Sequence, residues 1–186
     1  AGIDPKEPFD VTPYAEAVFQ YFLRNPIGQD MGRKFKIAFS SSEADTALTY
    51  LHDLGFIPKI KEEQGKQTRG FKVLIGGGLG SQPRKADVAY EFLPEDQIIR
   101  FTEGVIRVFD RYGERTKRLK ARMKFLFNEI GLAGFLKLVE KERLAIPNTT
   151  FSVDIAQYEQ VQHSLPTVKI VEIADRLQYD FWKETN

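Results

Sequence analysis

Hydrophobic residues recur at helical spacing near the beginning of the chain. Thr12 followed by Pro13 is typical of a helix N-cap with proline in the first turn, and apolar residues follow three and four positions apart. Asparagine, proline and glycine within residues 25–28 end this pattern. The sequence therefore predicts an amphipathic helix over residues 14–23, preceded by an extended polar arm over residues 1–10.

The next segment alternates in the manner of a strand. Hydrophobic residues at every second position occupy one face of a predicted strand over residues 33–39, and Lys34 and Lys36 occupy the other face. A serine and an aspartate with capping-box spacing then predict a helix over residues 42–53.

A hairpin pattern follows this helix. Residues 56–61 and 70–75 have the composition of strands, and the polar stretch over residues 62–69 connects them. A glycine-rich turn over residues 76–80 comes directly after the second strand. These segments predict a sheet whose neighbouring strands run antiparallel.

The second half of the chain has helical periodicity. Residues 98–109 form a strong apolar face, which a Tyr-Gly pair ends, and further helices are predicted at about 116–130 and over 132–144. Pro147 closes the predicted compact region, residues 1–147, and residues 148–186 are expected to be an extension or linker with a strand or two. The predicted fold class is α+β, a mixed or antiparallel sheet with helices packed on it.

Composition restricts the possible chemistry. The chain contains no cysteine, which excludes disulfides, cysteine-bound zinc, iron–sulfur clusters and cysteine nucleophiles within these residues. Its two histidines, His52 and His163, are far apart in the sequence, so no nitrogen-rich metal site is predicted. The net charge of +1 predicts no general attraction to nucleic acid or membranes. With no long apolar run and no signal-peptide pattern, we expect a soluble, cytoplasmic protein.

Lys34 and Lys36 form the first candidate site. Two residues along a strand advance about 6.6–7 Å, so both ammonium groups can face one cavity. Two cations on one face stabilise an anionic ligand or donate protons to a reacting oxyanion. Arg33 adds a third cation directly before the pair. The alternative is an ordinary amphipathic strand whose polar face is solvated.

Gly76, Gly77 and Gly78 form the second candidate site. Glycines allow a backbone to approach a ligand closely, and successive N–H groups can form an anion-binding nest. The turn matches neither the dinucleotide-binding glycine motif nor the phosphate-binding P-loop. The alternative is a flexible turn without a ligand.

The basic run over residues 111–124 is the third candidate site, with seven lysines and arginines and one glutamate. In a helix, Arg115, Arg118 and Arg122 would recur on one face, and Lys124 would belong to a neighbouring row of lysines. Such arginines can hold several carboxylates or phosphates. The alternatives are a solvated surface helix and a nucleic-acid helix, and the near-zero net charge disfavours the second.

Four segments, in this order, resemble the siroheme-dependent nitrite and sulfite reductases. They are residues 10–15, 33–36, 71–78 and 112–125. The resemblance extends over roughly residues 8–145. That family consists of two pseudo-symmetric halves, and the chain resembles the first half, without the iron–sulfur cysteines of the second.

The resemblance implies a function and a site. It implies a siroheme whose carboxylates are held by arginine and lysine, and the six-electron reduction of sulfite to sulfide or of nitrite to ammonia. Lys34 and Lys36 match the family's lysines that contact the substrate anion and supply protons. The cofactor-binding positions that it implies are Arg33, Gly76, Gly77, Gly78, Arg115, Arg118, Arg122 and Lys124.

The resemblance also implies partners outside these residues. They are the remaining half of the reductase, which carries the 4Fe-4S cluster of the complete enzyme, and ferredoxin or another electron donor. No metal ligand, nucleic acid or membrane is expected for this chain, and the isolated chain is expected to be inactive. The alternative function is a non-redox module that binds a polyanion, namely a tetrapyrrole, a nucleotide or a nucleic acid.

Overall fold

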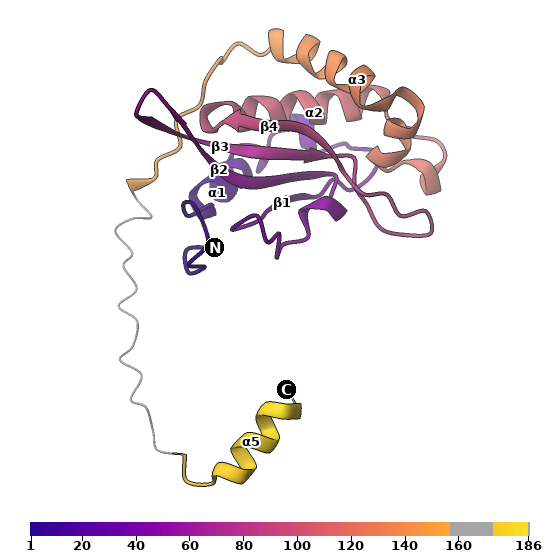
Figure 1. Cartoon of the computed structure of the whole chain (residues 1–186). Coiled ribbons are helices and arrows are strands. Elements are labelled where there is room, and N and C mark those ends of the chain that lie inside the picture. The colour runs from indigo at the N-terminus through magenta and orange to yellow at the C-terminus, as the bar shows by residue number, and fades with distance from the viewer. Residues whose placement is uncertain (157–172, 186) are drawn as a thin grey trace. The chain divides into compact units, whose positions relative to one another are not determined.

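The computed structural model describes residues 1–156 and 173–185 (Figure 1). Residues 1–155 form one compact unit, and the chain from residue 156 onwards forms a second. The first unit contains every predicted site residue. None of the helices in the described parts of the chain is long and apolar enough to cross a membrane.

A four-stranded sheet forms the centre of the first unit, with the strand order β1-β2-β3-β4. β1 runs parallel to β2, and the other neighbouring pairs are antiparallel. The fold is therefore α+β with a mixed sheet, as predicted. The strands are β1 (Ile37–Phe39), β2 (Leu54–Glu63), β3 (Lys66–Ile75) and β4 (Asp87–Pro94).

The predicted hairpin is confirmed, and its strands are longer than expected. β2 and β3 pair from Leu54 opposite Ile75 to Glu63 opposite Lys66. Only two residues remain for the turn, which have positive φ angles of 52° and 77°, as a tight hairpin turn requires. Sequence analysis missed β4, although its alternating aromatic and aliphatic residues are typical of a strand.

Helices cover one face of the sheet. The main ones are α1 (Thr12–Phe22), α2 (Ile98–Tyr112) and α3 (Met123–Leu144). The apolar face of α2 is buried as predicted, and its residues share one core with Phe56 and Phe71 of the sheet. In Figure 1, α2 and α3 lie above the sheet, and they pack against each other.

The helix predicted over residues 42–53 is not formed. Residues 42–53 form turns and a short 3-10 helix, Thr49–Leu51, because Asp45 and Leu48 adopt left-handed φ angles of 50° and 53°. The carboxylate of Asp45 accepts hydrogen bonds from the Thr49 backbone and hydroxyl. The predicted cap at Ser42 does not form, since its hydroxyl donates to Asp4 instead.

The helix predicted at about residues 116–130 begins later than expected. Residues 115–122 contain only a 3-10 helix, Arg118–Lys120, and α3 begins at Met123. The break expected between the two later helices is present, because Gly131 interrupts α3 with φ 67° and ψ 172°. The predicted strand over residues 33–39 is regular only in β1, and the lysines lie in the extended backbone just before it.

The ends of the compact unit differ in detail from the sequence prediction. The N-cap of α1 is Val11 rather than Thr12, whose N–H and hydroxyl both donate to Asp10. After Pro147 the chain continues to pack on the unit, where the Phe151 N–H donates to the Asp96 carbonyl at 3.0 Å. Residues 148–156 contain no strand, and residues 173–185 contain a helix, α5 (Arg176–Thr185). The other positions at which a strand or two was predicted, residues 157–172, lie outside the described residues.

Candidate functional site

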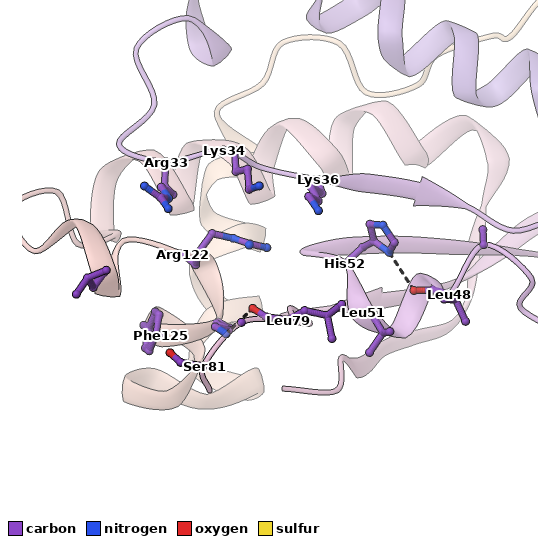
Figure 2. A pocket seen from close by; sticks show the side chains of 14 residues that line it. Arg33, Lys34, Lys36, Leu48, Leu51, His52, Leu79, Ser81, Arg122 and Phe125 are labelled. Carbon is purple, nitrogen blue, oxygen red and sulfur yellow. Dashed lines mark hydrogen bonds between the residues drawn. The ribbon is translucent and has the colours of Figure 1, made fainter. Parts of the chain in front are cut away.

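A pocket of about 510 Å³ lies between the lead-in to β1, the loop after β3 and the start of α3 (Figure 2). It collects residues that are far apart in the sequence, and most of the predicted cationic residues are among them. Its lining consists of Arg33, Lys34, Lys36, Ala47, Leu48, Leu51, His52, Leu79, Gly80, Ser81, Leu119, Arg122, Lys124 and Phe125.

The alternation predicted for the lysine segment is present. Phe35 packs into the core, with its ring 5.9 Å from that of Phe109. Lys34 and Lys36 therefore lie on the opposite side, where Figure 2 shows them with Arg33 along one edge of the pocket. The polar face of this segment is thus part of a concave site rather than a flat solvated surface.

The backbone at Lys36 is fixed from two sides. Its N–H donates to Oδ2 of Asp53 at 3.0 Å, and its carbonyl accepts from the N–H of Leu54 at 3.1 Å. These bonds anchor the extended segment to the beginning of β2, so the position of the lysine follows from the sheet register.

Arg122 reaches the pocket from the N-cap position of α3. Its guanidinium donates to both oxygens of Asp53, at 2.7 Å from Nη2 to Oδ2 and at 3.3 Å from Nε to Oδ1. The Asp53 side chain is fully buried. Burial raises the pKa of Asp53, and the hydrogen-bonded Arg122 guanidinium opposes this rise.

Lys124 is buried and organises the loop after β3. Its ammonium group donates to the carbonyl of Leu79 at 3.0 Å and also to that of Gln82. Burial lowers the pKa of Lys124, and the neighbouring charge of Arg122 lowers it further. Because an ammonium has three N–H donors, one remains for a ligand in the pocket.

The glycine turn has a different role from the predicted one. Gly76, Gly77 and Gly78 are buried and do not line the pocket. The N–H of Gly76 donates to the Asp53 carbonyl and that of Gly78 to the Arg84 carbonyl, each at 2.9 Å. Neither N–H is therefore available to bind an anion.

The turn instead allows close packing against the pocket walls. A Cβ at Gly77 would lie 2.4 Å from the Tyr50 carbonyl oxygen. A Cβ at Gly78 would lie 3.3 Å from Nη2 of Arg122 and 3.3 Å from Cδ of Lys124. The absence of side chains thus lets the turn support the segment before β2 and the two cations of α3.

Two of the predicted cofactor-binding arginines also lie outside the pocket lining. Arg115 forms an ion pair with Asp110 and donates to the carbonyl of Asp30 at 3.1 Å. Arg118 is exposed on the 3-10 helix. Since this segment is not an α-helix, Arg115, Arg118 and Arg122 do not share one helical face.

Sequence reasoning missed part of the site. His52 lines the pocket, and its Nδ1 lies 2.9 Å from the carbonyl oxygen of Leu48 (Figure 2). Asp53 does not line the pocket but fixes two residues that do. The available signal was an acidic residue directly before a strongly apolar strand, where an unpaired carboxylate would be costly.

All charged side chains that line the pocket are cationic. Its lining includes five side chains with cationic groups, Arg33, Lys34, Lys36, Arg122 and Lys124, and no carboxylate. In the described part of the chain, Arg33, Lys34 and Lys36 have no ion-pair partner. Four leucines and Phe125 add apolar surface to the lining. Such a site favours an anion that also has apolar surface.

The fold is that of a known protein class. The family model described as the nitrite and sulphite reductase 4Fe-4S domain matches residues 1–147. The chain therefore belongs to the nitrite and sulphite reductase family, which confirms the resemblance found in the sequence. The chain itself contains no cysteine, so it has no thiolate to ligate a 4Fe-4S cluster.

Individual relatives agree with this assignment. Sulfite reductase (ferredoxin) 1 of Mycolicibacterium paratuberculosis is 29% identical over 95% of this chain and 32% of its own length. The sulfite reductase (NADPH) hemoprotein beta-component of Myxococcus xanthus is 36% identical over 62% of this chain and 21% of its own length. The chain thus spans about a third or less of these relatives.

Solved structures share the fold. The structure of the Mycobacterium tuberculosis NirA protein matches with a TM-score of 0.68 and 30% identity, over 77% of this chain and 26% of that one. Dissimilatory sulfite reductase I matches with a TM-score of 0.52 and 11% identity, over 81% of this chain and 55% of that one. The second likeness supports the fold alone.

Proposed function

We propose that this chain is the anion- and siroheme-binding part of a nitrite or sulfite reductase. The complete enzyme would carry out the six-electron reduction of sulfite to sulfide or of nitrite to ammonia. The pocket carries this proposal, because its lining combines several cationic side chains with apolar walls and no carboxylate. The relatives' names include both sulfite and nitrite reductases.

The pocket fits the carboxylates of a siroheme. Arg33 and Arg122 would pair with carboxylates, and the remaining N–H donor of Lys124 would add a charge-assisted hydrogen bond. Leu119 and Phe125 offer apolar surface to the macrocycle. When bound, siroheme supplies an iron that binds the substrate and a conjugated ring that passes electrons to it.

Lys34 and Lys36 would act on the substrate itself. Their ammonium groups lie on one edge of the pocket and form no ion pair within the described residues, so they can pair with an oxyanion. Each oxygen that leaves sulfite or nitrite leaves as water, which requires protons as well as electrons. Hydrogen bonds from the lysines would stabilise the developing charge and deliver these protons.

The remaining components of the reaction would come from outside this chain. The 4Fe-4S cluster needs thiolate ligands, so it would be bound by the remaining half of the reductase. Ferredoxin is the donor that we propose, because several relatives carry it in their names, although one relative is named for NADPH. We place the enzyme in the cytoplasm.

Binding experiments on the chain test this function against a polyanion-binding module. Siroheme and a single-stranded oligonucleotide would be titrated separately, with absorbance as the readout at several salt concentrations. We expect siroheme to change its spectrum on binding and Arg33→Gln to weaken that binding. Lys137→Gln, at an exposed lysine of α3, is the charge-matched control and should bind like the wild type.

The same titrations can overturn the proposal. Oligonucleotide binding with a steep salt dependence, together with an unchanged siroheme spectrum, would identify a nucleic-acid module. Equal siroheme binding by Arg33→Gln and by the wild type would show that siroheme does not bind through this pocket.

A further inference from the structure

Asp53 connects the two cationic walls of the pocket without lining it. One of its carboxylate oxygens accepts from the Lys36 N–H at 3.0 Å, and the same oxygen accepts from Nη2 of Arg122 at 2.7 Å. Lys36 belongs to the segment before β1, whereas Arg122 is the N-cap residue of α3. A single buried side chain therefore sets the distance between a candidate substrate-binding residue and a candidate cofactor-binding residue.

The backbone of Asp53 fixes a third part of the site. Its carbonyl accepts from the N–H of Gly76 at 2.9 Å, at the beginning of the glycine turn. Loop residues just beyond that turn line the pocket, including Leu79 and Ser81. Three segments that surround the pocket thus meet at this one residue.

The buried ion pair between Asp53 and Arg122 holds both side chains in a fixed arrangement. Breaking a buried ion pair by removing one partner leaves an uncompensated charge, which is costly. Arg122 can form a planar fork with a carboxylate, which a lysine cannot reproduce. Both Asp53 oxygens accept from this fork, and the side chain is fully buried, so the arginine has little freedom to move away.

We propose that Asp53 is a positioning residue, which holds the Lys36 backbone and the Arg122 guanidinium in the arrangement that binds an anion. The proposal rests on the proposed function of the pocket. A positioning role and a purely electrostatic role predict opposite changes in anion affinity when the Asp53 charge is removed. Removing a negative charge beside a cationic pocket would strengthen anion binding if charge alone mattered. Loss of positioning weakens that binding instead.

Asp53→Asn separates these two effects, because it removes the charge and keeps the size of the side chain. The probe is sulfite, titrated into the isotopically labelled chain and followed by NMR. We expect the variant to bind sulfite at least fivefold more weakly than the wild type. We also expect the Lys36 amide and the Arg122 Nε–H to exchange faster with solvent.

The matched control is Glu142→Gln, which removes another nearly buried carboxylate, paired with Arg111 and absent from the pocket lining. It should lose stability without a change in sulfite affinity. Equal or tighter sulfite binding by Asp53→Asn would overturn the proposal, as would unchanged exchange at Lys36 and Arg122. Failure of the wild type to bind sulfite contradicts the proposed function, and the exchange rates then still decide whether Asp53 positions the two residues.

A second comparison applies if Asp53→Asn does not fold because the charge of Arg122 is left buried. The double variant Asp53→Asn with Arg122→Gln removes both charges, and Arg122→Gln alone is its reference. We expect faster exchange at the Lys36 amide in the double variant. Identical exchange and identical sulfite affinity in these two proteins would overturn the role of Asp53.

Discussion

The ammonium group of Lys124 donates a hydrogen bond to the carbonyl of Leu79 at 3.0 Å. It connects the first turn of α3 to the loop after β3, and a second bond from the same group reaches the carbonyl of Gln82. Burial lowers the pKa of Lys124 because it disfavours the charged ammonium, and the two carbonyls provide hydrogen-bond acceptors for that ammonium. The loop that lines the pocket therefore depends on one lysine of the basic run.

Lys124→Met should destabilise this loop. The variant keeps the length of the side chain but cannot donate to Leu79 or Gln82, and hydrogen bonds to charged groups contribute about 1.5–3 kcal/mol. We expect a lower free energy of unfolding in urea and faster hydrogen exchange at Ser81. Lys120→Met, at an exposed lysine of the same run, is the control. Equal effects of the two substitutions would show that the loop does not depend on Lys124.

Gly77→Ala should disturb the turn beneath the pocket. A Cβ there would lie 2.4 Å from the Tyr50 carbonyl oxygen and 2.6 Å from that of His52, and neither backbone atom can rotate away. Overpacking of this kind costs about 1–3 kcal/mol. Thermal denaturation should show a lower Tm for this variant. Gly28→Ala has nothing within 4 Å of its Cβ and should retain the wild-type Tm; a similar loss in both variants contradicts the argument.

The lysine side of the pocket could be predicted from the sequence because strand alternation is a local property. A period of two places Lys34 and Lys36 opposite Phe35 in any extended backbone. Strand patterns likewise located the hairpin, and helical periodicity located the buried face of α2. In each case neighbouring residues in the sequence were sufficient to decide the structure.

Arg122 and Lys124 line the pocket as predicted, but their arrangement could not be predicted because it depends on distant contacts. Arg122 is the N-cap of α3 and is bound by Asp53, which lies 69 residues earlier in the sequence. Arg115 is held by Asp110 and by the carbonyl of Asp30. These partners outweigh the helical propensity of the basic run, so a periodicity argument placed its residues on one face incorrectly.

Glu114 gives the segment before α3 a measurable dependence on pH. Its carboxylate accepts from the Thr116 N–H, the Thr116 hydroxyl and the Lys117 N–H, and these bonds lower the pKa of Glu114 from 4.5 to about 2. A carboxylate whose pKa is lower in the folded state than in the unfolded state stabilises the folded state at pH values above the unfolded-state pKa. This contribution is lost as the pH falls from about 4.5 towards 2.

Glu114→Gln tests this linkage. The amide can still accept these hydrogen bonds but carries no charge, so the wild type should be more stable than the variant near neutral pH. We expect the difference in unfolding free energy between the two proteins to shrink between pH 4.5 and pH 2. Urea denaturation at several pH values measures it. A difference that stays constant over this range would contradict the assigned pKa shift.

Replacing Lys34 or Lys36 by alanine in the complete reductase should strongly reduce turnover. Each substitution removes a charged donor from the pocket edge, and the loss of such a transition-state hydrogen bond costs about 2.7–4 kcal/mol, or roughly 100- to 1000-fold in rate. Turnover of sulfite and of nitrite would be measured with a reduced dye as the electron donor. Lys137→Ala, at an exposed position of α3, should leave turnover unchanged. Unchanged turnover in both single lysine variants would remove Lys34 and Lys36 from the substrate site, even if siroheme still binds.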